Sequence, residues 1–232
     1  MNLDFDFKIV RRPGRRTASI SVKDDSVIVI VPDTLSNEQI ERVVKRKARW
    51  IIKKLKFHLE VRKTYRPKEY VSGESFSYLG RNYRLKVLDG KPEKVSLRDG
   101  RLYVHAPHTL SGEARDRMIV AQLTDWYQEH ALIALKEKAK RFSAQVVVQP
   151  KKVGIKSYKS RWGSCNSQGE VLFNWRIIMA PQRIIDYVVA HEICHLVHHN
   201  HSKSYYKLLE SVVPDYKECK EWLKVNGQLL NL

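Results

Sequence analysis

The segment Pro181–His201 reads PQRIIDYVVAHEICHLVHHNH and decides how the C-terminal part of the chain is interpreted. Its apolar residues recur at helical spacing, and proline is favoured at the start of a helix. Within it, His191, Glu192 and His195 form the pattern HExxH. Residues four apart lie on one face of a helix. The segment therefore predicts a helix that ends near Asn200 and presents two imidazoles together.

Two histidines at this spacing can hold one zinc ion, with Zn–N distances of about 2.0–2.1 Å. Glu192 lies beside the first histidine, within reach of a water on the metal rather than of the metal itself. Because zinc lowers the pKa of such a water towards about 7, this carboxylate can accept its proton as a general base. The pattern predicts a zinc-dependent hydrolase, although the same ligands accept other divalent metals.

A third metal ligand has to come from a residue other than His191 and His195. His198 shares their face but lies about 4.5 Å further along the helix axis than His195, so it points past the metal. Asn200 favours a helix end, after which His201 can turn back, as in the HExxHxxxxxH spacing of metzincins. We therefore expect His201 to be the third ligand, ahead of His198 and His199. The remaining alternatives are two later carboxylates, Glu210 and Glu218.

A loop and a strand are predicted before the helix, over Ser160–Glu170 and Val171–Met179. An edge strand beside a catalytic helix often receives a peptide as an added strand. On that basis we expect Arg161 and Asn174 to contact substrate or to stabilise the transition state. The alternative is that this segment has only a structural role.

The N-terminal half contains a weak repeat at an offset of 75 residues: VKDDSVIVIVPDTLS at Val22–Ser36 and LRDGRLYVHAPHTLS at Leu97–Ser111. Each copy is typical of two strands joined by a turn, at Asp24–Asp25 and Asp99–Gly100, and of a serine that begins a helix. Convergence on the same hairpin chemistry is the alternative to duplication. The other predicted elements are a hairpin over Phe76–Leu88 that turns at Gly80, and helices over Glu38–Lys63 and Glu113–Phe142.

A strand that ends at Pro150 marks a predicted domain boundary. We expect an α+β protein with a β-rich N-terminal region over residues 1–142, which contains a possible duplicated β-β-α element and a basic helix. A zincin-like catalytic domain with HExxH on a helix follows over residues 143–232.

The charge of the chain is strongly positive. Its 232 residues include 43 Lys and Arg against 25 Asp and Glu, a formal net charge of +18. Such a charge attracts polyanions. Arg42–Lys56 alone carries eight basic residues and no acid, so nucleic acid is an expected partner of this face, with a solvated basic helix as the alternative.

The three cysteines suit free thiols in a reducing cytosol better than a disulfide framework. No apolar stretch approaches the length of a membrane span. We therefore expect a cytoplasmic protein without a membrane partner. The cysteines are Cys165, Cys194 and Cys219.

Several segments resemble the YgjP-like metallopeptidase family, which is related to the WLM and SprT-type zincins. The resemblance is close from Tyr158 to Leu223 and looser in YLGRNYRL; it implies a zincin fold with Glu192 as the catalytic residue. One departure is Tyr205-Tyr206, where the family usually has Phe-Trp, which we interpret as conservative packing. The matching segments are RWGSCNSQGEVLFNWRIIMAP, IDYVV, HEICHL, NHS and PDYKECKEWL, and the implied zinc ligands are His191, His195 and His201.

Three functions stay open at this point. The first, which HExxH and a third histidine favour, is a zinc peptidase that acts on a peptide or protein. The second is a pyrophosphatase-type nucleotide phosphohydrolase, because metal-activated water also attacks phosphorus; the chain has no GxxxxGK[ST] loop or carboxylate cluster to support it. The third is a nucleic-acid-associated protein, with or without protease activity.

Overall fold

The computed structural model describes residues 5–23, 26–64 and 67–232, with side chains for 5–22, 26–56 and 67–232. The protein is a mixed α+β chain, as predicted, and its contacts divide it into two compact units, Met1–Pro67 and Lys68–Leu232. The expected boundary near residue 142 differs from this division. Helix α2 (Gly112–Gln145) runs through it and packs on strands from both sides, β7 (Arg101–His105) and β8 (Lys152–Lys156).

The first unit packs one helix on a small sheet. Alternate residues of the central strand are buried against one stripe of the helix, and this gives the unit its own core of Val27, Val29, Val31, Ile40, Val44 and Ile51. Ser36 and Gln39 exchange hydrogen bonds of 3.3 and 3.0 Å at the start of the helix, a capping box. The predicted turn at Asp24–Asp25 lies outside the described residues. The elements are β1 (Phe7–Arg12), β2 (Ser19–Lys23), β3 (Ser26–Pro32) and α1 (Asn37–Thr64), with sheet order β1-β3-β2.

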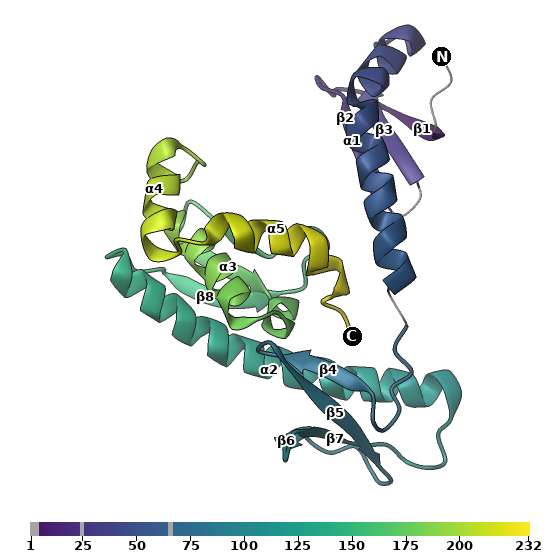
Figure 1. Cartoon of the computed structure of the whole chain (residues 1–232), viewed down its shortest axis with the longest axis vertical. Coiled ribbons are helices and arrows are strands. Elements are labelled where there is room, and N and C mark those ends of the chain that lie inside the picture. The colour runs from purple at the N-terminus through teal and green to yellow at the C-terminus, as the bar shows by residue number, and fades with distance from the viewer. Residues whose placement is uncertain (1–4, 24–25, 65–66) are drawn as a thin grey trace. The chain divides into compact units, whose positions relative to one another are not determined.

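The second unit begins with a four-stranded sheet that packs against α2 (Figure 1). The predicted hairpin is confirmed: β4 (Ser75–Tyr78) and β5 (Arg81–Leu88) pair antiparallel around Gly80. A Cβ at Gly80 would lie 2.9 Å from the Cα of Pro181, so the hairpin tip approaches the chain closely just before the helix that carries His191. The sheet order is β4-β5-β7-β6, with β6 at Ser96–Arg98.

Both sheets contain the same strand arrangement before a long helix. In each, a first strand runs parallel to the third, which pairs antiparallel with the second, giving the orders β1-β3-β2 and β5-β7-β6. Burial follows the same offset of 75 residues. Val27, Val29 and Val31 correspond to Leu102, Val104 and Ala106, all of them buried.

The second unit continues with a three-stranded sheet of order β8-β10-β9 and three helices. The strand predicted over Val171–Met179 is wrong in its second half, because the Asn174 side chain accepts a bond of 3.2 Å from the Arg176 amide and starts a 3-10 helix. The strand expected before Pro150 is absent: α2 ends at Gln145, and a turn at Val146 and Val147 follows it. The elements are β9 (Gly163–Cys165), β10 (Glu170–Asn174), η1 (Trp175–Met179), α3 (Gln182–Cys194), α4 (Lys203–Val212), α5 (Tyr216–Asn226) and η2 (Gly227–Leu229).

In the described part of the chain, no helix combines the length and the apolar character needed to cross a membrane. All three cysteines are free thiols, and Cys194 and Cys219 are buried.

Candidate metal centre

Helix α3 carries His191 and Glu192, and His195 caps its C-terminal end. The helix packs on α2, α4, α5 and β9, so its position is determined from several sides. One clamp is electrostatic: Asp186 of α3 accepts contacts from Lys138 at 2.7 Å and from Arg141 at 2.9 Å, both on α2. The helix that presents the candidate ligands is therefore attached to the longest helix of the unit.

His191, His195 and His201 lie together, with one ring nitrogen of each within 4.8 Å of the others. Over residues 5–23, 26–64 and 67–232, this is the group of His, Cys, Asp or Glu side chains that could hold a metal ion. The Nε2 atoms of His191 and His201 are 3.3 Å apart. The expectation that the chain turns back after the helix to bring in a third histidine agrees with this geometry.

The turn begins earlier than the sequence predicts. The helix ends at Cys194 instead of near Asn200, and the amide of His198 still bonds to the Cys194 carbonyl at 3.0 Å. The carbonyl of His198 lies 2.9 Å from Nδ1 of His195, and this contact requires the chain to curl back at that point. His198 thus acts through its backbone, and its side chain, like that of His199, is outside the cluster.

The two carboxylates considered as alternative ligands also lie outside the cluster. They make surface ion pairs: Glu210 with Lys217 at 3.9 Å, and Glu218 with Arg183 at 3.6 Å.

Tyr205 of α4 orients the first histidine. Its hydroxyl lies 3.1 Å from the His191 carbonyl, to which it donates, and 2.7 Å from Nδ1 of the same residue. Because the hydroxyl proton is used on the carbonyl, Nδ1 must donate to the hydroxyl oxygen, which leaves Nε2 with a lone pair. The Nδ1–carbonyl contact of His195 fixes the same tautomer there. Both Nε2 atoms are therefore available to a metal.

Burial keeps the imidazoles of His191 and His195 neutral. It lowers the pKa of His191 to about 3, with further lowering by the neighbouring His195, His201 and Lys220. Burial also lowers the pKa of His195, against the hydrogen bond to His198, which raises it. Neutral imidazole is the form that binds a metal.

Glu192 is buried, with 7% of its surface exposed, directly beside the cluster. Burial raises its pKa to about 7, while the positive charge of Arg161 lowers it. The side chain lies against the backbone of β9: a Cβ at Gly163 would be 2.5 Å from Glu192 Cγ. This contact was not predicted from the sequence, although a glycine inside a strand is a signal of close approach.

The two predicted substrate residues have different surroundings. Arg161 is exposed, with its guanidinium 5.4 Å from the Tyr158 ring centroid and its charge acting on Glu192. Asn174 is buried, and its Nδ2 donates to the carbonyls of Tyr158 at 3.1 Å and Arg161 at 3.3 Å. Asn174 therefore positions the loop that carries Arg161, using its own polar atoms to do so.

Comparison with known proteins identifies the family to which the chain belongs. The family model described as YgjP-like, metallopeptidase domain matches residues 16–226. The chain is also similar to the crystal structure of the metallopeptidase zymogen of Pyrococcus abyssi abylysin. The match covers 41% of this chain and 94% of the abylysin chain, with 19% sequence identity and a TM-score of 0.37. No curated protein matches. Because the family model spans most of the 232 residues, the chain belongs to the YgjP-like metallopeptidase domain family.

Proposed function

We propose that the protein is a zinc-dependent peptidase in which His191, His195 and His201 hold the metal. Two nitrogens that each lie about 2.0–2.1 Å from one tetrahedral zinc ion are about 3.3–3.4 Å apart. The 3.3 Å between Nε2 of His191 and Nε2 of His201 matches this separation, and it is the observation that carries the proposal. A set of three imidazoles without a carboxylate also suits zinc better than magnesium.

Zinc bound there would supply a Lewis acid and lower the pKa of water. Glu192 is then the general base: its buried carboxylate beside the cluster can take a proton from the attacking water and give it to the leaving amine. Arg161, whose charge already reaches Glu192, is placed to stabilise negative charge that develops on the scissile carbonyl oxygen.

The sheet beside α3 offers a place for a peptide. Strand β9 lies at the end of the order β8-β10-β9, so among the described strands one of its edges has no partner. An extended substrate can add to such an edge through backbone hydrogen bonds. Because Gly163 of β9 contacts Glu192, a peptide on this edge would lie beside the general base.

Replacement of Glu192 by Gln tests the proposal. We expect zinc-loaded protein to cleave an unstructured protein such as casein, to lose this activity in EDTA, and to lose about 10²–10⁴-fold in kcat in the variant while binding one zinc ion. Glu210→Gln, a change on α4 outside the cluster, is the matched control. Activity that survives EDTA or the Glu192→Gln change would refute the mechanism.

The same preparations test the nucleotide alternative. If the zinc-loaded protein releases phosphate or diphosphate from nucleoside triphosphates, and cleaves no peptide, the metal centre serves phosphoanhydride chemistry and the peptidase proposal fails. If triphosphates stay intact while casein is cleaved, the alternative fails.

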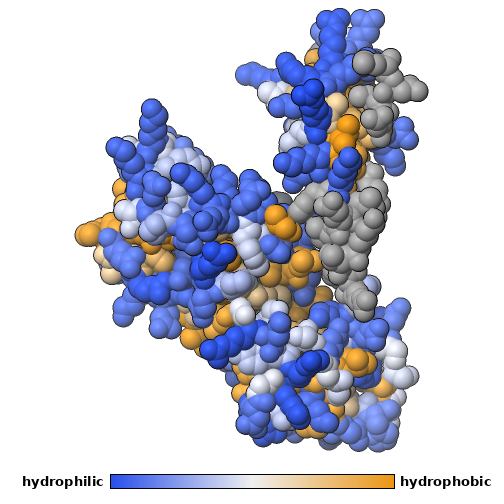
Figure 2. Space-filling model, in the orientation of Figure 1, coloured by the Kyte–Doolittle hydropathy of each residue, from blue (hydrophilic) through white to orange (hydrophobic). Residues whose placement is uncertain are grey.

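We also propose that the first unit binds single-stranded nucleic acid. Residues 1–67 contain 17 Lys and Arg against 8 Asp and Glu, which is half of the net charge of the whole chain. Figure 2 shows hydrophilic side chains over most of the visible face of this unit. Trp50, 44% exposed, lines a hollow of about 520 Å³ together with Arg46 and Lys47. The rest of the lining is mainly apolar, and an exposed aromatic ring beside two cations suits base stacking and phosphate contact.

A salt titration checks this second proposal. Affinity for a labelled oligonucleotide should fall steeply and linearly in log–log form as salt rises, and Trp50→Ala should weaken it about fivefold or more. Affinity that is insensitive to salt, or equal in the variant, would contradict it.

Finally, we propose that the two strand-and-helix arrangements derive from a duplicated element. Their common strand order and the burial pattern at an offset of 75 residues support this. A chimera that carries Leu102–Ala106 in place of Val27–Val31 should therefore fold with a cooperative thermal transition. A chimera that stays unfolded by circular dichroism would argue for convergence.

A further inference from the structure

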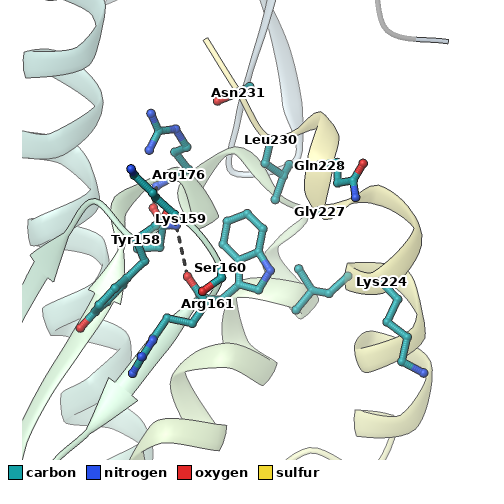
Figure 3. A pocket seen from close by; sticks show the side chains of 13 residues that line it. Tyr158, Lys159, Ser160, Arg161, Arg176, Lys224, Gly227, Gln228, Leu230 and Asn231 are labelled. Atoms are coloured by element: carbon teal, nitrogen blue, oxygen red, sulfur yellow. Dashed lines mark hydrogen bonds between the residues drawn. The ribbon is translucent and has the colours of Figure 1, made fainter. Parts of the chain in front are cut away.

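A basic pocket of about 510 Å³ lies between the loop that precedes β9 and the C-terminal segment of the chain (Figure 3). Trp162 forms part of its wall, with its ring packed against Gly227, where a Cβ would lie 3.0 Å from the ring. Its lining includes no Asp or Glu. The cationic residues that line this basic pocket are Lys159, Arg161, Arg176 and Lys224.

Two of these cations lie on the same side of the basic pocket. Figure 3 shows that Lys159 and Arg176 extend to this side, whereas Arg161 extends to the other side with Tyr158. Arg176 stacks on Trp175, with 4.5 Å between its guanidinium carbon and the ring, and burial lowers its pKa. Its Nε is buried and has no hydrogen-bond partner in the part of the chain that the structure describes. Because Arg176 lines the basic pocket, its guanidinium can donate charge-assisted hydrogen bonds to an anion there.

The basic pocket lies next to the start of β9, the strand whose unpaired edge we propose binds the substrate. Residues 158–162, which form one wall, come immediately before β9 in the chain. A peptide that added to β9 in antiparallel orientation would run in the opposite direction. Its residues on the C-terminal side of the scissile bond would therefore point towards the start of β9 and the basic pocket.

We propose that the basic pocket binds a carboxylate of the substrate on the C-terminal side of the scissile bond, either an acidic side chain or the terminal carboxylate. This inference rests on the proposed peptidase function and adds a substrate class to it. Lys159 and Arg176 are the specificity-determining residues, because they are cations directed to one side of a pocket that has no acidic lining residue.

The test uses the zinc-loaded full chain and matched peptides. Peptides with Glu or Gln at each of the three positions after the cleaved bond, and with free or amidated C-termini, separate a side-chain carboxylate from the terminal one. We expect kcat/KM to be about fivefold to tenfold higher for one carboxylate form, mainly through KM. Lys159→Glu should abolish this preference.

Lys136→Glu is the control, because it makes the same charge change at an exposed lysine of α2 that does not line the basic pocket. Equal rates for acidic and neutral peptides in the wild type, or a preference that survives Lys159→Glu, would overturn the inference. A preference for acid on the N-terminal side would also overturn it.

A binding measurement keeps this inference separate from the proposed function. Fluorescence anisotropy with zinc-loaded Glu192→Gln protein reports affinity without turnover. If the wild type cleaves no peptide, the peptidase proposal fails, yet weaker binding of the acidic peptide after Lys159→Glu would still support a carboxylate pocket. If Lys159→Glu weakens only the binding of a nucleoside triphosphate, the pocket is a phosphate site and the carboxylate inference is wrong.

Discussion

At the scale of single residues, the Tyr205 hydroxyl orients one of the candidate metal ligands, His191. It bonds both the backbone and the ring of His191, and burial raises its pKa, so it stays a neutral donor at physiological pH. Gly163 has a comparable role for the base, because only a residue without a Cβ leaves room for the Glu192 side chain. The centre thus depends on residues that are neither ligands nor the base.

Tyr205→Phe tests the first of these contacts. The ring can still pack, but Nδ1 of His191 loses its hydrogen bond, so zinc affinity should fall about tenfold or more. Competition with a chromophoric chelator measures it. Tyr206→Phe, whose ring packs on Tyr216, is the control, and equal affinities in the two variants would show that the hydroxyl has no orienting role.

Gly163→Ala tests the second contact. The added Cβ would lie 2.5 Å from Glu192 Cγ, so the carboxylate must move, and kcat should fall about 100-fold while one zinc ion stays bound. Gly154→Ala on β8, whose Cβ would meet only the end of the Leu172 side chain at 3.0 Å, should change kcat little. Full activity in Gly163→Ala would mean that Glu192 is free to adjust.

The grouping of the three histidines could be predicted from the sequence because HExxH places two of them on one helix face and distance excludes His198. The orienting contacts could not, since they depend on where α4 packs. Tyr205 illustrates this. From the sequence, a tyrosine where the family usually has phenylalanine suggests only conservative packing, but in the structure its hydroxyl makes two hydrogen bonds with His191.

At the scale of secondary structure, α3 depends on its attachment to α2. Asp186 receives both Lys138 and Arg141, and its side chain is only 25% exposed. Partly buried, charge-assisted bonds stabilise more than exposed ion pairs do. This clamp positions the segment that bears His191 and Glu192.

Asp186→Ala should lower the free energy of unfolding by about 1–2 kcal/mol, measured by urea denaturation of the metal-free protein. Glu113→Ala removes the exposed i,i+4 pair with Arg117, whose side chains are 90% and 74% exposed, and should change it by less than about 0.5 kcal/mol. Similar losses in both variants would contradict a special role for the clamp.

The helices themselves could be predicted because apolar periodicity and capping residues act locally. Two boundaries could not. The end of α3 is set by the bond between His195 and the His198 carbonyl, and the end of β10 by Asn174, which the loop at Tyr158–Arg161 holds. Both depend on contacts made only in the folded chain.

At the scale of the whole molecule, each unit has its own hydrophobic core, and the candidate ligands and Glu192 all lie in the second. The domain boundary expected at residue 142 rests on a strand-like stretch that ends at Pro150, whereas α2 continues through residue 142 with buried Phe142 and Ser143.

A fragment of residues 68–232 should therefore fold, bind one zinc ion and unfold cooperatively, while losing most of the affinity of the full chain for an oligonucleotide. Circular dichroism, metal analysis and anisotropy measure these properties. A fragment that is unfolded would show that the two units stabilise each other.

The central claim is that His191, His195 and His201 together hold one metal ion. X-ray data collected from zinc-loaded crystals on both sides of the zinc absorption edge test it most directly. The account predicts one anomalous peak per chain, about 2.0–2.1 Å from Nε2 of each of these histidines. A peak on His198, His199 or a carboxylate instead, or no peak at the cluster, would contradict it.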